Sequence, residues 1–407
     1  MRQRSDLTFK ENLKNGRHGW LRLTPAYSAK LVQNYLPDNN KDISILDPFS
    51  GSGTTPLFAG YEGYKCLALE LNPFLVWFAE AKTRNYSFEI IKEAEAIGNE
   101  IISLFISDKL ESVQPPPIKN IERWWDESAL NFLCSIKWGI EENKNEIEEQ
   151  SINLLNFVFS ITMMKLSNTA HNHQSLSFSE SENQSDLFDL KQKYVQRFKS
   201  DLNFVIESAN DNPEIEATII KGDAREVDSY ISNKVDLVIT SPPYPNRMSY
   251  IRELRPYMYW NNFLFEAREA GELDWEAIGG TWGIATSRLT DWTPDKKNGF
   301  YPDYFTEILK KISDQKNKNG NKMANYVARY FEDTYQHLLS ITKLLNPNSK
   351  VHYVIGNSTF YGVLVPVEIL YKDIMLNVGF RNVNIEKIRK RNSKKELFEF
   401  VVSADYG

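Results

Sequence analysis

The 407-residue sequence has little cysteine, no long apolar run and no excess of positive charge. Cys66 and Cys134 are too few for a disulfide framework and lack the spacing of a metal site. No apolar run approaches the ~20 residues that a membrane-spanning helix needs. The N-terminus "MRQRSDLTFKENLK" lacks the apolar core of a secretory signal. We therefore predict a cytoplasmic protein with no metal and no membrane partner.

The formal net charge of −6 argues against a uniformly basic nucleic-acid-binding protein. Positive charge is nevertheless gathered locally, as in "KIRKRNSKK" at 387–395, which holds six basic residues and no acidic one. A solvated surface is the simplest interpretation of such a run. Binding of nucleic acid would require the charge to lie on one face of the fold, and composition alone leaves both interpretations open.

Short apolar segments typical of β-strands alternate with helical periodicity in three parts of the chain. The last two expected strands, "VNIEKIRKR" and "ELFEFVVSA", are joined by a polar turn and should form an antiparallel pair. The alternation predicts an α/β fold with a mostly parallel sheet covered by helices on both faces. The other expected strands lie at 43–49, 64–71, 217–224, 235–240 and 350–358.

Two stretches interrupt this alternation, and we interpret them as insertions in one α/β core. Residues 90–210 are helical in pattern, apart from a polar, serine-rich segment at 171–190 that predicts a mobile loop. Residues 256–324 are rich in Trp, Tyr, Gly and Lys and show no clear period. The predicted order is core (1–89), helical insertion (90–210), core (211–255), second insertion (256–324) and core (325–407).

A glycine-rich turn follows the first expected strand in "ILDPFSGSGTTPLFAG". Asp47 ends the strand, and Gly51 and Gly53 occupy the turn, where glycine allows the backbone to approach a ligand closely. Glu70 ends the next strand, where a carboxylate can accept hydrogen bonds from ribose hydroxyls. The lysine of a phosphate-binding P-loop is missing, whereas NAD and other ribose-bearing cofactors stay possible. Asp223 follows a later strand and could accept from an adenine amino group or only shape a turn.

The strand "VDLVIT" runs into a stiff corner, "SPPY", at residues 241–244. Pro242 and Pro243 fix two φ angles and remove two backbone donors. The corner is therefore rich in acceptors, namely the Ser241 hydroxyl and the carbonyls of Ser241 and Pro242, which suit a substrate NH₂ group. Tyr244 offers a ring on which a base could stack, worth about 1–3 kcal/mol per base. The alternative is a purely structural Pro-Pro turn at a sheet edge.

In this order, the motifs resemble those of the S-adenosylmethionine-dependent DNA amino-methyltransferases, which carry a [DNS]PP[YFW] catalytic motif. "DPFSGSGTT" resembles their cofactor motif, "ALELNP" their ribose-binding strand end and "TSPPY" their catalytic corner. "HGWLRLTPAYSAKLVQNYL" (18–36) resembles the segment that packs over the methionine part of the cofactor. The resemblance covers roughly 18–90, 215–255 and 325–405. It implies a Rossmann-like class I methyltransferase fold, with a mostly parallel seven-stranded sheet and an antiparallel final hairpin.

The resemblance also implies a reaction, a cofactor and a set of site residues. S-adenosylmethionine would donate its methyl group to the exocyclic amine of a base flipped out of double-stranded DNA, without a covalent enzyme intermediate. A cognate restriction endonuclease could be a partner. The implied catalytic residues are Ser241, Pro242, Pro243 and Tyr244. The implied cofactor-binding residues are Thr24, Pro25, Asp47, Phe49, Gly51, Gly53, Thr54, Glu70, Leu71, Asp223 and Ala224.

The target base is the least constrained part of this interpretation. In the family that the motifs resemble, serine at the first motif position is commoner among N4-cytosine enzymes, whereas the order with the cofactor motif first is opposite to that of many of them. We favour N4 of cytosine, with N6 of adenine as the alternative. RNA or tRNA base methylation, or a catalytically silent cofactor-binding subunit, are two further alternatives.

Target recognition would fall to an insertion, and we favour the region that leads out of the catalytic corner. Arg247, Arg252 and Arg255 could contact phosphates or guanine edges. Alternatively, they could pair on the surface with neighbouring acidic residues, namely Glu253, Glu266 and Glu269. "IGGTWGIATSRL" at 278–289 is a candidate recognition loop.

Overall fold

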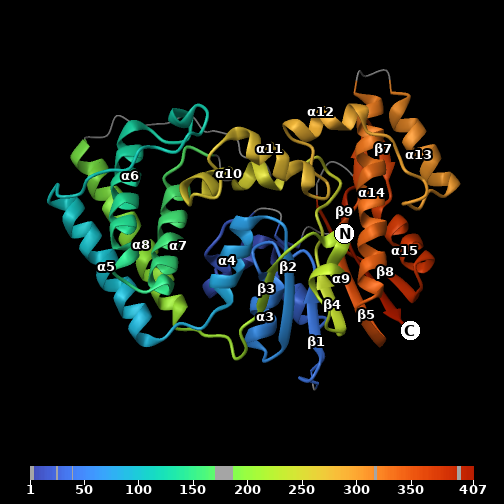
Figure 1. Cartoon of the computed structure of the whole chain (residues 1–407), viewed down its shortest axis with the longest axis horizontal. Helices are drawn as coiled ribbons and strands as arrows, with labels where there is room; N and C mark the ends of the chain where they lie inside the picture. Colours follow the sequence, from blue (N-terminus) through green and yellow to red (C-terminus); the bar gives the residue numbers. More distant parts are fainter. Residues whose placement is uncertain (1–3, 24–25, 39, 170–186, 316–318, 392–395) are drawn as a thin grey trace.

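The computed structural model describes residues 4–23, 26–38, 40–169, 187–315, 319–391 and 396–407, which are arranged around a central sheet (Figure 1). Within these residues the sheet has seven strands in the order β3-β2-β1-β4-β5-β9-β8. Strands β3, β2, β1, β4 and β5 run parallel to one another, whereas β9 runs antiparallel to both β5 and β8. The predicted fold class, a Rossmann-like class I methyltransferase fold with an antiparallel final hairpin, is confirmed.

The strands coincide closely with the apolar runs of the sequence. A separate two-stranded hairpin, β6-β7, was not expected. The bounds are β1 (Ser44–Asp47), β2 (Lys65–Glu70), β3 (Thr218–Lys221), β4 (Val235–Thr240), β5 (Leu345–Gly356), β6 (Ser358–Phe360), β7 (Val363–Val365), β8 (Phe380–Lys390) and β9 (Phe398–Tyr406).

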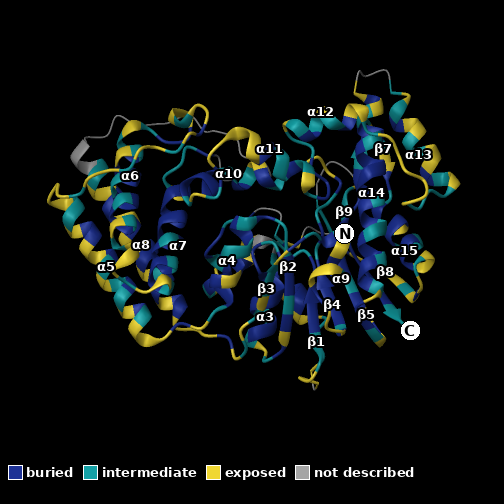
Figure 2. Cartoon of the chain, in the orientation of Figure 1, coloured by how far each residue is buried: buried dark blue, intermediate teal, exposed yellow. Residues whose placement is uncertain are grey.

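Helices cover both faces of the sheet, so the central strands are buried (Figure 2). Ile45 of β1 packs in one cluster with Leu31 of α2 and Ala59 of α3. Its neighbour Leu46 points the opposite way and packs in the cluster that contains α14 and α15. The helices on these faces are α2 (Ala29–Gln33), α3 (Thr54–Tyr61), α9 (Val227–Tyr230), α14 (Gly320–Thr342) and α15 (Val367–Asn377).

The first insertion forms a helical lobe beside the sheet, at the left of Figure 1. Phe78 of α4 packs against Phe157 of α7 in one large apolar cluster that also contains Phe74 and joins the lobe to the core. Residues 170–186 lie outside the described residues, and the expectation of a loop to residue 190 is wrong at its end, because α8 begins at Leu187. α4 (Pro73–Thr83) belongs to the core. The helices of the lobe are α5 (Phe88–Ile106), α6 (Glu127–Glu142), α7 (Glu149–Lys165) and α8 (Leu187–Ala209), with turns η3 (Ile121–Arg123) and η4 (Asn143–Asn145).

The second insertion is also helical, although its sequence showed no period. Its helices are short and separated by glycine- and proline-containing turns, and Pro256 lies inside the first of them. In Figure 1 α10 and α11 lie above the sheet, between the helical lobe and α12. The helices are α10 (Tyr250–Trp260), α11 (Ala267–Glu276), α12 (Ile284–Asp291) and α13 (Asp303–Ser313). The remaining short elements are η1 (Ser5–Leu7), α1 (Phe9–Asn12), η2 (Gly16–Gly19) and η5 (Ala224–Glu226).

Candidate active site

A pocket opens at the carboxyl ends of the parallel strands, where α/β sheets place their ligands. It extends from the glycine turn after β1 to the corner after β4. Nine of the cofactor-binding and catalytic residues expected from the sequence line this pocket, namely Phe49, Gly51, Thr54, Glu70, Leu71, Asp223, Ala224, Ser241 and Pro243. Asp47, Gly53, Pro242 and Tyr244 lie next to lining residues in the chain but do not line the pocket themselves, and Thr24 and Pro25 lie outside the described residues.

The glycine turn requires glycine for two reasons. Gly51 and Gly53 have φ of 53° and 72°, in the left-handed region that strains other residues. A Cβ added to Gly53 would also come within 3.1 Å of the Ala79 Cβ. The Gly51 N–H donates to Glu70 Oε2 at 2.8 Å, which ties the turn to the end of β2.

Two acidic groups lie at these strand ends with raised pKa values. Burial raises the pKa of Glu70 to about 7, although backbone N–H groups of Asn72 and Gly51 act in the opposite direction. Burial likewise raises the pKa of Asp47 to about 6. Asp47 Oδ1 accepts from the Thr240 hydroxyl at 2.6 Å, whereas its Oδ2 is buried and has no hydrogen-bond partner among the described residues.

The Ser-Pro-Pro-Tyr corner is held by hydrogen bonds from distant elements. The Ser241 hydroxyl donates to the Val354 carbonyl at 3.1 Å, which leaves its oxygen lone pairs to accept. Tyr330 of α14 donates to the Pro243 carbonyl at 2.8 Å, and the Tyr244 N–H donates to the Tyr250 hydroxyl at 3.3 Å. The corner is therefore fixed, with the Ser241 hydroxyl as an acceptor at the pocket wall.

The ring of Tyr244 lies beside the pocket, against the final hairpin. Its hydroxyl donates to Glu399 Oε1 at 3.1 Å, and Arg389 binds the same carboxylate at 2.5 and 2.8 Å. The Arg391 guanidinium lies over the ring, with Cζ 5.2 Å from the centroid. A Cβ at Gly356 would lie 2.9 Å from Tyr244 Cδ2, so glycine makes room for the ring. Sequence reasoning missed this support, and the basic run at 387–395 was its only signal.

Part of the pocket wall comes from the second insertion, which sequence reasoning also missed. The lining includes residues 278–280, which begin the candidate recognition loop at 278–289, so the start of this loop faces the pocket. The lining residues from the insertion and from the preceding segment are Met248, Tyr250, Ile251, Leu254, Asp274, Glu276, Ala277, Ile278, Gly279 and Gly280.

The three candidate DNA-contacting arginines follow the corner. Arg247 and Arg252 are exposed, whereas Arg255 is partly buried with its Cζ 4.6 Å from the ring centroid of Trp282. Two of the acidic residues proposed as their alternative partners, Glu266 and Glu269, form the capping box at the start of α11. Helix capping thus accounts for these two glutamates.

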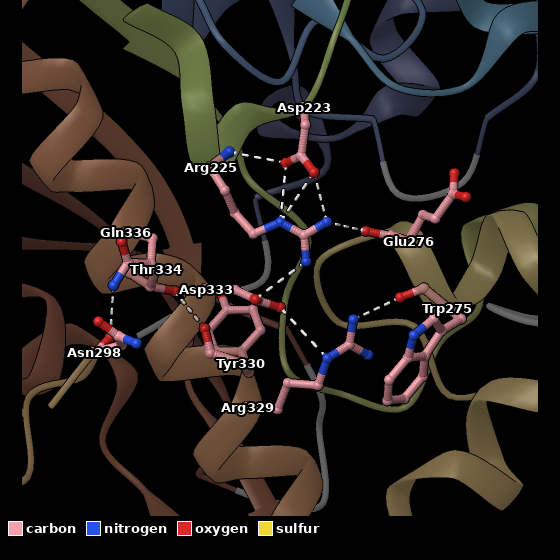
Figure 3. Close-up of polar contacts among 10 residues, drawn as sticks. All are labelled: Asp223, Arg225, Trp275, Glu276, Asn298, Arg329, Tyr330, Asp333, Thr334 and Gln336. Carbon is pink, nitrogen blue, oxygen red and sulfur yellow. Dashed lines mark hydrogen bonds and ion pairs between the residues drawn. The ribbon is translucent and has the colours of Figure 1, made fainter. Parts of the chain in front are cut away.

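Asp223 lines the pocket and is engaged by its near neighbour Arg225 (Figure 3). The Arg225 guanidinium donates to both carboxylate oxygens, at 2.5 to 3.0 Å. It also donates to Asp333 Oδ1 at 3.2 Å and to the Glu276 carbonyl at 2.8 Å. Arg329, which faces Asp333 from the other side, donates to the Trp275 carbonyl at 2.5 Å. These contacts connect the end of β3 with the second insertion.

The part of the chain that the structure describes holds neither a membrane-spanning helix nor a cluster of metal-ligating side chains. No helix there is long and apolar enough to cross a membrane. No group of three or more His, Cys, Asp or Glu side chains there could hold a metal ion.

The sheet order defines the fold, which is that of the Rossmann-like class I methyltransferases, with a pocket at the carboxyl ends of the strands. In sequence, the chain is similar to two curated proteins named as Type II methyltransferases. It is 22% identical to M.BsoBI of Geobacillus stearothermophilus over 444 residues, covering 97% of this chain and 85% of that protein. It is 23% identical to M.MvaI of Kocuria varians over 382 residues, covering 88% and 78%.

Comparison with family models gave no match. Among solved structures, TrmN from Thermus thermophilus has a TM-score of 0.34 and 10% identity, covering 98% of this chain and 52% of that one. The rRNA methyltransferase aviRa from Streptomyces viridochromogenes has a TM-score of 0.30 and 9% identity, covering 95% and 87%. The chain thus spans about half the length of the TrmN chain, and these scores add nothing to the fold derived above.

Proposed function

We propose that this protein is an S-adenosylmethionine-dependent DNA methyltransferase of a restriction-modification system, acting on an exocyclic amino group. The observation that carries the proposal is the continuous pocket that joins Glu70 and the glycine turn to Ser241 and Pro243. Similarity to two Type II methyltransferases over most of the chain supports the same class of substrate. The proposed partner is double-stranded DNA, and a cognate endonuclease would complete such a system.

The residues at the strand ends fit the proposed cofactor. Glu70 is placed to accept from the ribose, while Phe49, Leu71 and Ala224 offer apolar surface to the base. Ser50 lines the pocket, and its Oγ is buried without a partner among the described residues, so it can receive a donor from a ligand. On the resemblance of their segment, we assign Thr24 and Pro25 to the methionine end. When bound, the cofactor would supply an electrophilic sulfonium methyl group.

The corner would prepare the target amine for attack. The Ser241 hydroxyl and the carbonyls of Ser241 and Pro242 would accept its hydrogens, which favours a pyramidal nitrogen with an available lone pair. Tyr244 would stack on the flipped base, and the rigid Pro242-Pro243 unit would hold the acceptors in place. Most of the rate gain would come from orientation. The amine would lose one proton to solvent as its nitrogen is methylated.

For target recognition, we propose that Arg247, Arg252 and Arg255 contact DNA, since they follow the corner directly. We keep N4 of cytosine as the favoured target on the serine of the motif. N6 of adenine is the alternative.

Mass spectrometry of nucleosides tests the reaction directly. Unmethylated plasmid DNA and, separately, unmodified tRNA are incubated with the purified protein and S-adenosylmethionine, digested and analysed. We expect N4-methylcytosine in the DNA alone. N6-methyladenine would overturn the choice of base, and transfer to tRNA alone would overturn DNA as the substrate. If neither nucleic acid is modified by folded protein at saturating cofactor, methyl transfer itself is contradicted.

The raised pKa of Glu70, about 7, predicts a pH-dependent cofactor affinity. Between pH 7.5 and 5.5 the carboxylate gains a proton and becomes a weaker acceptor for the ribose. We therefore expect affinity for S-adenosylmethionine to fall on the order of tenfold in this range, as measured by calorimetry. The Glu70→Gln variant should bind S-adenosylmethionine weakly at both pH values. If the affinity of the wild-type protein is the same at pH 7.5 and 5.5, Glu70 does not bind the ribose.

The stability of the free protein should change in the opposite direction. Because burial raises the pKa of Glu70 above its ordinary value of 4.5, its contribution to the free energy of unfolding is fully present below pH 4.5 and is lost as the pH rises through about 7. Loss of affinity at pH 5.5 therefore cannot be ascribed to this group destabilising the fold. Urea unfolding at both pH values provides the control.

A further inference from the structure

The second insertion closes the pocket with a segment that is bound to the core by two arginines. Residues 276–280 line the pocket and include two glycines, and Ile278 packs in the apolar cluster that contains α14. Gly279 has φ of 77°, and its carbonyl accepts from the Tyr326 hydroxyl at 3.3 Å. The order of this wall must therefore come largely from anchors in the surrounding structure.

The strongest anchors act at the carboxyl end of α11, immediately before the wall. The last carbonyls of a helix have no intrahelical partner and attract cations. Here Arg329 of α14 binds the Trp275 carbonyl at 2.5 Å and Arg225 of η5 binds the Glu276 carbonyl at 2.8 Å (Figure 3). Arg329 also lies over the Trp275 ring, with Cζ 3.7 Å from the centroid. Two core cations thus hold two consecutive carbonyls of the insertion.

The same arginines are oriented by two aspartates, one of them at the end of β3. Asp333 is 8% exposed and lies between the guanidinium groups, 3.2 Å from Arg225 Nη1 and 3.9 Å from Arg329 Nε. Asp223 accepts from the backbone N–H of Arg225 at 2.9 Å as well as from its guanidinium. Three N–H groups of Arg225 thus bind a carboxylate that has about four acceptor positions. Asp223 therefore has little capacity left for an adenine amino group.

We propose that Arg225 is a positioning residue for the cofactor pocket, which holds the 276–280 wall against the nucleoside half of the cofactor. The inference rests on the proposed function, because it assumes that the pocket binds S-adenosylmethionine. The wall lies at the nucleoside end, since Arg225 joins it to the end of β3, which pairs with β2 where Glu70 lies. Asp223 serves the cofactor through Arg225 in this arrangement, rather than as the acceptor for adenine expected from the sequence.

Calorimetric titration with three ligands tests this role: S-adenosylmethionine, S-adenosylhomocysteine and 5′-methylthioadenosine, which lacks the amino-acid part. For Arg225→Gln we expect Kd to rise about tenfold for all three, because the loss is confined to the nucleoside half that they share. Arg225→Lys keeps the charge but cannot bind two acceptors with a planar fork, so it should recover only part of the affinity.

Arg288→Gln is the matched control. Arg288 also lies near the Trp275 ring, at 5.5 Å, and pairs with Glu272 at 2.8 Å, but it does not bind the wall. Its Kd values should stay within twofold of wild type. If Arg225→Gln does not fold, Asp333→Asn, which retains an acceptor for Arg225, should raise all three Kd values about threefold.

Three outcomes separate this inference from the proposed function. If the folded variants bind all three ligands like wild type, the positioning role is wrong and the proposed function stands. The role is also wrong if affinity falls for S-adenosylmethionine but not for 5′-methylthioadenosine. If the wild-type protein binds none of the three ligands, the proposed cofactor is wrong and the inference fails with it.

Discussion

Replacing Tyr244 by alanine is expected to lower the rate of methyl transfer to DNA about 100-fold while affinity for the cofactor stays within twofold. The rate falls because base stacking on an aromatic ring is worth up to about 3 kcal/mol. Affinity is preserved because the ring lies beside the pocket rather than in its lining. Glu399 keeps its two bonds to Arg389, so the hairpin stays in place. Initial rates with tritiated S-adenosylmethionine and a cofactor titration provide the two measurements.

Tyr244→Phe separates the ring from its hydroxyl. It keeps the stacking surface and loses the bond to Glu399, so its rate should fall less than tenfold. Glu399→Gln should lower the rate of methyl transfer less in the Tyr244→Phe background than in the wild-type protein, because both substitutions remove the same hydrogen bond. Unchanged turnover in Tyr244→Ala would exclude a stacking role for this residue.

The sequence predicts those parts of the site that are formed by residues close together in the chain. A glycine turn after a strand, an acidic strand end and a Pro-Pro corner each depend on a few adjacent residues. Because parallel strands end at the same edge of the sheet, Gly51, Glu70 and Ser241 had to meet once the α/β alternation was recognised. The structure places all three around one pocket.

The parts that could not be predicted depend on contacts between distant segments. Tyr330 bonds to Pro243 across 87 residues, and Tyr244 bonds to Glu399 across 155. No local pattern marks such partners. The pocket wall lies in a region of short helices separated by turns, where a helical period is too brief to detect.

The basic run at 387–395 shows the limit of reading charge from composition. From composition alone, this run allows two interpretations, a solvated surface or a nucleic-acid-binding face. In its described part, Arg389 binds Glu399, Arg391 lies over Tyr244, and Lys387 Nζ lies 4.2 Å from the ring centroid of Phe398. These three cations therefore serve the packing of the corner and hairpin, because a cation close to an aromatic face or a buried carboxylate is stabilised there.

The largest expected effect on stability comes from Arg17, whose side chain is fully buried and, among the described residues, donates to no carboxylate. Its guanidinium donates to the carbonyls of Ser208, Lys82, Arg84 and Ala209 and to Asn212 Oδ1, at distances between 2.5 and 3.3 Å. Burial lowers the pKa of Arg17, but a guanidinium stays charged in proteins. One side chain thus joins the N-terminal segment to the ends of α4 and α8.

Arg17→Met keeps much of the volume and removes every donor, which leaves several buried acceptors without partners. Each such loss costs about 1–3 kcal/mol where water cannot replace the donor, so we expect the free energy of unfolding to fall by roughly 3–5 kcal/mol. Arg84→Met, which breaks a surface pair with Glu80, should cost less than about 1 kcal/mol. Urea unfolding of both variants makes the comparison. Equal losses would mean that water reaches the Arg17 carbonyls, and that the N-terminal segment is held to the core mainly by the apolar contacts of Trp20 and its neighbours.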